Sequence, residues 1–143
     1  MKKIVIIGSL GYLGTELCKI YSGESWRNKI IALDNRFISE RVSQLHDWNI
    51  EFFQGHILDK TFLKKHLSDA DVVHHLAGVT DVAYVKTEAN SELDRRIQSV
   101  AIEGTNNILN SIPKNCKIIF PSTHVVFEGF KIAKKNIKEN EKP

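Results

Sequence analysis

Five short apolar runs alternate along the chain with longer segments whose apolar residues recur at helical spacing. The runs are rich in Ile, Val and Phe, and they lie at residues 3–7, 29–33, 50–54, 72–76 and 117–120. Compact runs of this kind are typical of strands buried on both faces of a parallel sheet. Strands that alternate with helices need right-handed crossovers, which place helices on both faces. The pattern predicts an α/β fold with a doubly wound parallel sheet in three layers, αβα.

The segment after the first run has the pattern of an amphipathic helix. Its charged residues Glu16 and Lys19 fall on one face. Its apolar residues fall on the other face, and they are Leu13, Leu17, Ile20 and Tyr21. We expect this apolar face to pack against the sheet.

Further helical segments follow. Residues 36–48 predict a helix, and Asp59 is placed to cap the start of a short third one. We expect His46 and His66 on polar helix surfaces. A long helix at residues 91–112 carries an apolar stripe formed by Leu93, Ile97, Val100, Ala101, Gly104, Ile108 and Ile112. Core packing is the favoured role of this stripe, and a homodimer contact through residues 91–112 is the less favoured one.

Three glycines, Gly8, Gly11 and Gly14, separate the first run from the first helix. At such a junction the first glycine permits a tight turn and the second lets the backbone approach a diphosphate. The third lets the helix pack close to the strand, and the N–H groups of the helix N-terminus attract the anion. The arrangement predicts a Rossmann-type fold that binds a dinucleotide at the carboxyl ends of its strands.

Asp34 follows the second run, about 20 residues after Gly14. A carboxylate at this place accepts hydrogen bonds from both ribose hydroxyls and repels a 2′-phosphate, which favours NAD over NADP. Two features favour other interpretations. Asp34 beside Asn35 also fits a simple turn, and Arg36 is able to pair with a 2′-phosphate. With the glycine turn in register, NAD is the favoured cofactor.

The composition of the 143 residues, with a net charge of +3, is that of an ordinary single domain. The lysines of residues 131–142 interleave with glutamates, which favours a solvated surface over a nucleic-acid site. No apolar run approaches the ~20 residues that a membrane span needs. Cys18 and Cys116 indicate reduced thiols in a cytoplasmic protein. His74 and His75 are adjacent on a strand and point to opposite faces, which predicts no shared metal.

Six motifs in order resemble the extended short-chain dehydrogenase/reductases, in particular the NAD-dependent epimerase/dehydratase family of nucleotide-sugar enzymes. They are the glycine turn with Tyr12 and Leu13, and residues 32–35, 55–59, 71–78, 104–109 and 121–129. The resemblance covers the whole chain. It implies NAD as cofactor and a nucleotide sugar as substrate, with a hydride passed from a sugar carbon to NAD.

The resemblance also implies roles for residues at the matched positions. The implied cofactor-binding residues are Gly8, Gly11, Tyr12, Leu13, Gly14, Asp34, Asn35, His56, Ile57, Leu76, Ala77, Gly78 and Thr80. Thr123 is the implied catalytic residue, because it would hydrogen-bond the reacting hydroxyl of the sugar. A strand-end threonine that bonds local backbone is the alternative for Thr123.

The chain departs from the family pattern at two positions. His56 stands in place of an aspartate that contacts adenine, although a neutral imidazole nitrogen is able to accept the same bond. Ala101 stands in place of an asparagine near the cofactor. The family's Tyr-x-x-x-Lys pair is not found in residues 1–143, and the resemblance places it after Pro143. We therefore expect residues 1–143 to be an incomplete NAD-binding domain, without turnover on its own.

Two other functions remain as alternatives. One is a non-catalytic module that senses NAD(P). The other is an NAD(P)-dependent deoxysugar or carbonyl reductase of the same fold, because the Ser-Thr-x-x-Val-Phe-x-Gly pattern at residues 122–129 is similar to that of deoxysugar reductases. A Tyr-x-x-x-Lys pair soon after Pro143 would favour the enzyme over the sensor. Tighter binding of NADP than of NAD would favour the reductase.

Overall fold

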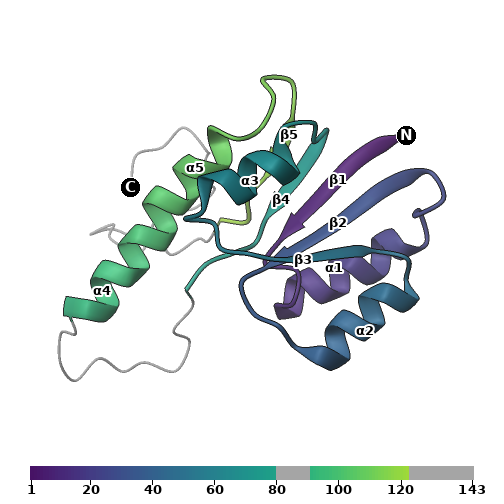
Figure 1. Ribbon diagram of the computed structural model, residues 1–143, viewed down its shortest axis with the longest axis horizontal. Coiled ribbons are helices and arrows are strands. Elements are labelled where there is room, and N and C mark those ends of the chain that lie inside the picture. Colours follow the sequence, from purple (N-terminus) through teal and green to yellow (C-terminus); the bar gives the residue numbers. More distant parts are fainter. Residues whose placement is uncertain (80–90, 123–143) are drawn as a thin grey trace, which may run out of the picture.

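The computed structural model describes residues 1–79 and 91–122 (Figure 1). Strands and helices alternate along the chain, as the apolar pattern predicts. The first half contains β1 (Lys2–Ile7), α1 (Tyr12–Ser22), β2 (Asn28–Asp34), α2 (Ser39–Asp47), β3 (Glu51–Gln54) and α3 (Lys60–Leu67). The second half contains β4 (Val72–His75), α4 (Ser91–Gln98), a π-helical segment η1 (Ser99–Gly104), α5 (Thr105–Leu109) and β5 (Lys117–Ile119).

The strands form one five-stranded sheet in the order β3-β2-β1-β4-β5, and all its pairs are parallel. Strand β1 lies at the centre, where Ile4 pairs with Ile30 of β2 and with Val72 of β4. The chain first winds outward from β1 to β3, then crosses back and continues on the other side of β1. This reversal places a crevice at the carboxyl ends of β1 and β4. The predicted doubly wound parallel fold is confirmed.

Apolar side chains cover both faces of the sheet. Helices α1 and α2 lie on one face, and α3, α4 and α5 lie on the other (Figure 1). The core on the α1 and α2 side includes Ile4, Ile6, Ile30, Ala32, Cys18 and Leu45. The core on the opposite side includes Val5, Ile7, Leu33, Leu63, Val73 and Ile108. Alternate residues of each central strand thus face alternate layers, as expected for strands buried on both faces.

The face that α1 turns to the sheet agrees with the prediction in part, because Leu17 and Tyr21 pack against the core as expected. Leu13 and Ile20 are exposed, at 61% and 68% of their surface, whereas Gly14 and Cys18 are buried. Gly14 approaches the glycine turn so closely that an added Cβ would lie 2.2 Å from the Gly8 carbonyl oxygen. This contact rotates the helix so that Leu13 and Ile20 point away from the sheet. Burial raises the pKa of the Cys18 thiol to about 12.

The long helix also differs from the prediction, because it is interrupted by η1 and ends at Leu109. Hydrogen bonds in a π segment run from i to i+5, so each turn takes more residues than an α turn. The apolar stripe nevertheless packs in the core, as predicted, over most of its length, and Ile112 contacts the core beyond the end of α5. Val100, Gly104 and Ile108 are buried, but Ala101 is exposed.

His66 of α3 is buried, which makes the predicted polar surface position wrong. Its ring packs against Phe53 and Phe62, with ring centroids 4.3 and 4.7 Å away. Burial, and to a lesser extent the charge of Lys65, lowers the pKa of His66. The start of the same helix agrees with the prediction, because Oδ1 of Asp59 accepts a hydrogen bond from the Phe62 backbone N–H at 2.9 Å.

His74 and His75 point to opposite faces of β4, as predicted. His74 Nε2 lies 2.9 Å from the Tyr21 hydroxyl on the α1 side. His75 Nε2 lies 2.9 Å from the Thr105 hydroxyl on the α5 side. Burial lowers the pKa of both histidines.

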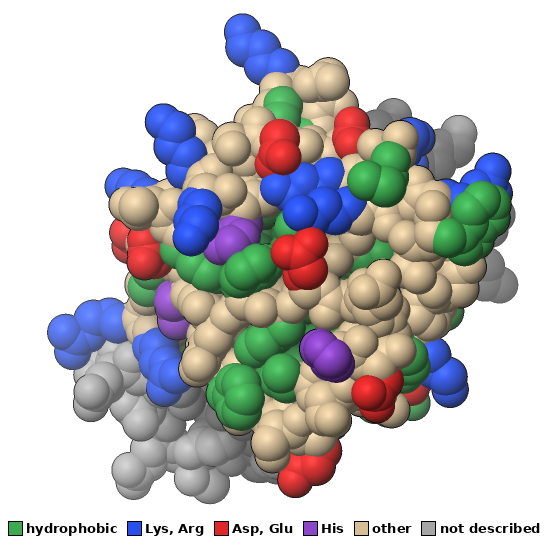
Figure 2. All heavy atoms as spheres, turned by 45° about the vertical axis from the view of Figure 1, so that its right-hand side comes forward, with side chains coloured by type: hydrophobic (Ala, Val, Ile, Leu, Met, Phe, Trp, Pro, Cys, Tyr) green, Lys and Arg blue, Asp and Glu red, His purple; other side chains and the backbone are tan. Residues whose placement is uncertain are grey.

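The charged surface is mixed on the face that Figure 2 presents, where Lys and Arg side chains are interspersed with Asp and Glu. Within residues 1–79 and 91–122, no helix is long and apolar enough to cross a membrane. The same residues contain no cluster of three or more His, Cys, Asp or Glu side chains able to hold a metal ion.

Candidate dinucleotide site

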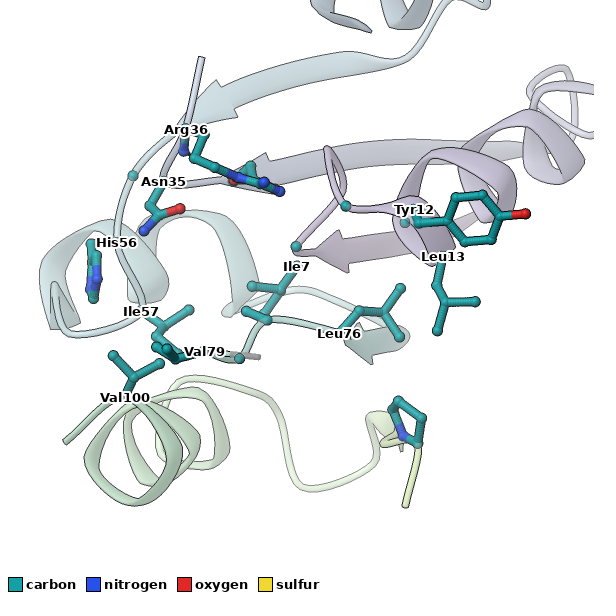
Figure 3. Close-up of a pocket in the computed structure, with 18 of the residues that line it drawn as sticks. Ile7, Tyr12, Leu13, Asn35, Arg36, His56, Ile57, Leu76, Val79 and Val100 are labelled. Atoms are coloured by element: carbon teal, nitrogen blue, oxygen red, sulfur yellow. Dashed lines mark hydrogen bonds and ion pairs between the residues drawn. The ribbon is translucent and has the colours of Figure 1, made fainter. Parts of the chain in front are cut away.

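A cavity of about 600 Å³ opens at the carboxyl ends of the central strands. Its walls are the glycine turn after β1, the ends of β2 and β3 with their following loops, and the segment after β4. Asn35 and His56 lie toward one end of this cavity, and Tyr12 and Leu13 lie toward the other (Figure 3). The site therefore lies at the reversal of strand order, where α/β sheets of this kind bind ligands.

The glycine turn is shaped by two close approaches. Gly8 has a φ of +84°, a left-handed conformation that favours glycine. An added Cβ at Gly8 would lie 2.8 Å from the Ala77 backbone nitrogen, so the turn contacts the segment after β4 directly. The Gly8 and Ser9 N–H groups both donate to the Leu33 carbonyl oxygen, at 2.8 and 3.1 Å. The turn is thus fixed between β2 and β4.

The first turn of α1 forms part of the cavity wall. Gly11 is the N-cap residue of α1. Because glycine has no side chain, it forms no side-chain hydrogen bond to the first N–H groups of the helix. These N–H groups, together with the helix dipole, form a site for an anion. An added Cβ at Gly11 would meet the Gly8 carbonyl oxygen at 3.2 Å. The absence of a side chain there keeps the backbone accessible, and a diphosphate fits this environment.

Asp34 is buried at the end of β2, with 5% of its surface exposed. Its Oδ2 accepts a hydrogen bond from the Leu10 N–H of the glycine turn at 2.9 Å. Its Oδ1 accepts from the Arg36 backbone N–H at 3.0 Å and from Arg36 Nε at 3.2 Å. The Arg36 bonds show that Asp34 does organise a local turn, which was the alternative interpretation. The Leu10 bond shows that it also joins β2 to the glycine turn.

The loop after β3 forms another wall through His56 and Ile57. His56 Nδ1 accepts a hydrogen bond from the Leu58 N–H at 3.1 Å. The nitrogen that is able to accept a bond in the neutral ring is therefore engaged by Leu58, and a bond between His56 and adenine stays a prediction. The Ile57 carbonyl oxygen accepts from Nδ2 of the buried Asn107 at 3.2 Å.

The cavity brings together every predicted cofactor residue that the structure describes. These residues are Gly8, Gly11, Tyr12, Leu13, Gly14, Asp34, Asn35, His56, Ile57, Leu76, Ala77 and Gly78. The ring of Tyr12 is 80% exposed and points away from the other lining side chains (Figure 3). The predicted residues Thr80 and Thr123 lie outside the described residues.

Sequence reasoning missed two lining residues from the long helical segment. Arg96 and Val100 line the cavity, whereas Ala101, the position compared with the family, is exposed. The four-residue spacing of Arg96 and Val100 places them on one helix face, so the helical period contained the signal. Within the π segment Val100 is buried and Ala101 is exposed. No pattern in the sequence indicated this segment.

Two further residues support the site from outside the cavity wall. Arg41 of α2 donates through Nη1 to the Leu10 carbonyl oxygen, so both peptide groups of Leu10 are held, one by Arg41 and one by Asp34. Asn107 of α5, on the other face of the sheet from α2 (Figure 1), donates in the same manner to the Ile57 carbonyl oxygen. Each contact joins residues far apart in the sequence, and local patterns therefore give no indication of either.

Comparison with known proteins agrees with this arrangement. Residues 5–142 match the 3-beta hydroxysteroid dehydrogenase/isomerase family. A dTDP-D-glucose 4,6-dehydratase of Dictyostelium discoideum is 30% identical over 137 residues, which are 89% of this chain and 30% of that protein. An uncharacterized protein, 052L, of Frog virus 3 is 30% identical over 112 residues, which are 76% of this chain and 29% of that protein. The chain thus spans about 30% of the length of these curated relatives.

Solved structures share the fold. A dTDP-glucose 4,6-dehydratase from Bacillus anthracis, crystallised in complex with NAD, has a TM-score of 0.74 at 18% identity, covering 100% of this chain and 44% of that one. An ADP-L-glycero-D-manno-heptose-6-epimerase from Helicobacter pylori has a TM-score of 0.72 at 24% identity, covering 99% of this chain and 45% of that one. The match over residues 5–142 shows that the chain belongs to the 3-beta hydroxysteroid dehydrogenase/isomerase family, within the extended short-chain dehydrogenase/reductases.

Proposed function

We propose that residues 1–143 form the NAD-binding domain of an NAD-dependent oxidoreductase of the nucleotide-sugar epimerase/dehydratase type. The observation that carries this proposal is that one cavity is lined together by the glycine turn, the start of α1 and the buried Asp34. These features supply the groups that a dinucleotide needs, namely free N–H groups for the diphosphate and a carboxylate for the ribose. The dehydratase and epimerase similarities support the reaction class.

The order of the strands suggests how the coenzyme lies. The diphosphate rests on the first turn of α1, after β1. The adenosine ribose lies at Asp34, after β2, and the base lies one strand further out, at His56 and Ile57 after β3. The nicotinamide half extends across the segment after β4, along Leu76 and Gly78. Each predicted cofactor residue in the described part then has a place along one extended ligand. In the proposal, Thr80 also contacts the nicotinamide half.

The preference for NAD or NADP depends on how the Asp34 carboxylate divides its hydrogen bonds between the ribose and Arg36. Beside the Nε bond, Nη2 of Arg36 lies 3.4 Å from Asp34 Oδ2, and the arginine side chain is 54% exposed. Binding of the ribose diol to the buried Asp34 carboxylate displaces part of this ion pair, and the exposed guanidinium of Arg36 is able to turn to solvent. The buried carboxylate supports NAD. The guanidinium, which is able to pair with a 2′-phosphate, is the observation that supports the alternative NADP-dependent reductase.

The chemistry requires parts of the protein beyond the described site. In this proposal Thr123 hydrogen-bonds the hydroxyl on the sugar carbon that passes its hydride to the coenzyme. A Tyr-x-x-x-Lys pair and a substrate-binding part, in sequence after Pro143, complete proton transfer and nucleotide-sugar recognition. The much greater length of the curated relatives supports this division of the protein.

We further propose a homodimer in the cytoplasm. The long helical segment supports the dimer, because Ile102 and Leu109 expose 64% and 48% of their surface on its outer side. A second copy of the segment would cover these apolar residues. The free thiols of Cys18 and Cys116 support a reducing compartment.

Asp34→Asn tests the coenzyme site. The substitution keeps the shape of the side chain. It replaces the charged carboxylate, which accepts hydrogen bonds from Leu10 and Arg36, with an uncharged amide. We expect the dissociation constant for NAD⁺, measured by isothermal titration calorimetry, to rise by roughly tenfold or more. Asp47→Asn, on the exposed end of α2, is the matched control and should leave the constant unchanged.

The same titration with NADP⁺ separates the two coenzymes. Wild-type protein should bind NAD⁺ more tightly than NADP⁺, and Asp34→Asn should narrow the difference because it removes the repulsion of a 2′-phosphate. Tighter binding of NADP⁺ by the wild type would contradict the proposed use of Asp34. Failure to bind either coenzyme would refute the proposed function.

A further inference from the structure

Arg36 lies in the cavity between the end of β2 and the start of α1. Its side chain extends from the residues after β2 toward the glycine turn (Figure 3). Nη2 of Arg36 lies 3.9 Å from the point that a Cβ on Gly11 would occupy. Among the described residues that are not adjacent to Gly11, no other side chain comes within 4 Å of that point. The guanidinium therefore stands beside the N-cap of α1.

The same guanidinium is held by the Asp34 carboxylate. Nε of Arg36 donates to Oδ1 at 3.2 Å, and Nη2 donates to Oδ2 at 3.4 Å. The guanidinium carries further hydrogens on Nη1 and Nη2. Within the part of the chain that the structure describes, these make no bond to the protein, and 54% of the side chain is exposed. Arg36 is therefore able to donate to a ligand while it stays bonded to Asp34.

The charges around the cavity make Arg36 the cation nearest to the start of α1. The charged side chains among the described lining residues are Asp34, Arg36 and Arg96. Arg96 belongs to α4, which lies on the other face of the sheet from α1 (Figure 1). Arg41 is bonded to the Leu10 carbonyl oxygen and does not line the cavity. An anion at the first turn of α1 thus has Arg36 as its neighbouring positive charge.

The position of this guanidinium distinguishes between the phosphates of a coenzyme. If the proposed function is correct, the 2′- and 3′-hydroxyls of the adenosine ribose bind Asp34, and the 5′ side leads to the diphosphate at α1. The 2′ and 5′ substituents leave the ribose on opposite sides of the ring, so a 2′-phosphate projects away from the diphosphate. Nη2 of Arg36 lies near both Asp34 Oδ2 and Gly11, which is the side of the carboxylate that faces the diphosphate.

We propose that Arg36 binds the diphosphate of the coenzyme, at the phosphate joined to adenosine, and does not bind a 2′-phosphate. Hydrogen bonds from a guanidinium to a phosphate are charge-assisted and therefore strong. Because NAD and NADP carry the same diphosphate, Arg36 contributes to the affinity for both and does not select between them. This inference rests on the proposed dinucleotide site, and it assigns a ligand to the arginine there.

Arg36→Gln tests this assignment in calorimetric titrations with NAD⁺, NADP⁺ and adenosine 5′-monophosphate. The substitution removes the charge of the side chain and leaves the backbone N–H of residue 36 bonded to Asp34. We expect the dissociation constants for NAD⁺ and NADP⁺ to rise by the same factor, roughly tenfold. The constant for adenosine 5′-monophosphate, which carries only the phosphate joined to adenosine, should rise by a similar factor.

Two further variants separate the position of the charge from its presence. Arg27→Gln makes the same change at an exposed residue before β2, where the guanidinium lies over the Trp26 ring, and should leave all three constants unchanged. Arg36→Lys keeps a charge but loses the planar fork of donors, so it should recover part of the affinity for all three ligands. Circular dichroism checks that each variant is folded. If Arg36→Gln does not fold, Arg36→Lys replaces it, with a smaller but still equal loss for NAD⁺ and NADP⁺.

Three results would overturn the inference. A loss of affinity for NADP⁺ alone would make Arg36 a ligand of the 2′-phosphate. Unchanged or tighter binding of NAD⁺ by Arg36→Gln would show that the arginine only competes with the ribose for Asp34. An unchanged constant for adenosine 5′-monophosphate would exclude the phosphate joined to adenosine. Absence of binding of all three ligands to the wild type would instead show that the proposed function is wrong, and the inference would fall with it.

Discussion

Gly14 lies where α1 meets the glycine turn, and its lack of a side chain sets the distance between them. An added Cβ would stand 2.2 Å from the Gly8 carbonyl oxygen and 2.7 Å from Ser9 Cα. Both neighbours are backbone atoms of the turn, which is fixed by bonds to Leu33. A side chain at this position therefore cannot be accommodated by a rotamer change. The helix would have to move away from the turn.

Gly14→Ala should consequently destabilise the protein by about 2 kcal/mol or more, measured by urea unfolding. Gly23→Ala is the matched control. Its added Cβ would lie 3.6 Å from the Ile20 carbonyl oxygen, an ordinary contact, and its φ of −65° suits alanine. The control should keep the wild-type free energy of unfolding within about 0.5 kcal/mol. Equal stabilities for the two variants would show that the close approach at Gly14 does not constrain the fold.

The long helical segment from α4 to α5 has an inner side that contacts Ile57 and an exposed outer side. On its inner side, Gly104 lies so close to Ile57 that an added Cβ would meet the isoleucine Cδ1 at 2.4 Å. Asn107 bonds the Ile57 carbonyl from the next turn. On its outer side, Ile102 and Leu109 are exposed. The inner side thus shapes the candidate dinucleotide site, and the outer side is the proposed dimer surface.

Ile102→Glu tests that surface, because a charge at a buried apolar contact is strongly unfavourable. We expect wild-type protein to sediment as a dimer and the variant to sediment as a monomer in velocity ultracentrifugation. Glu103→Gln changes the neighbouring exposed residue without adding charge, and it should remain dimeric. A monomeric wild type, or a dimeric Ile102→Glu variant, would contradict the proposed dimer.

At the scale of the whole molecule, three buried histidines couple folding to pH. The pKa values of His66, His74 and His75 are lowered, in each case mainly by burial. These rings stay neutral in the folded protein at a pH where the unfolded chain, with a pKa near 6.5, binds protons. The unfolded state then holds more protons than the folded state. Stability is fully present above about pH 6.5 and falls as the pH is lowered through the folded values.

The free energy of unfolding in urea should therefore decrease between about pH 7 and pH 5, by at most about 1.4 kcal/mol per pH unit for each histidine. His75→Gln removes one of the three groups and should reduce this dependence. His46→Gln, on an exposed helix face, should not. Asp69, whose pKa is lowered chiefly by its hydrogen bond with Lys3, contributes only at lower pH. A free energy that stays constant over this range would contradict the expectation.

The sequence alone determined the order of strands and helices, the glycine turn and the acidic residue at the end of β2. These features depend on local periodicity and on the chemistry of single positions. They can therefore be recognised without knowing which distant residues are in contact. The cap at Asp59 and the opposite directions of His74 and His75 were predictable for the same reason.

The tertiary structure decided what depends on residues far apart in the chain. The rotation of α1 that exposes Leu13 results from the approach of Gly14 to Gly8, and the burial of His66 results from its packing against Phe53. The bonds that hold Leu10 and Ile57 come from other layers of the fold. The period of a helix identifies its apolar side chains, but only the neighbours packed around it select the face that is buried.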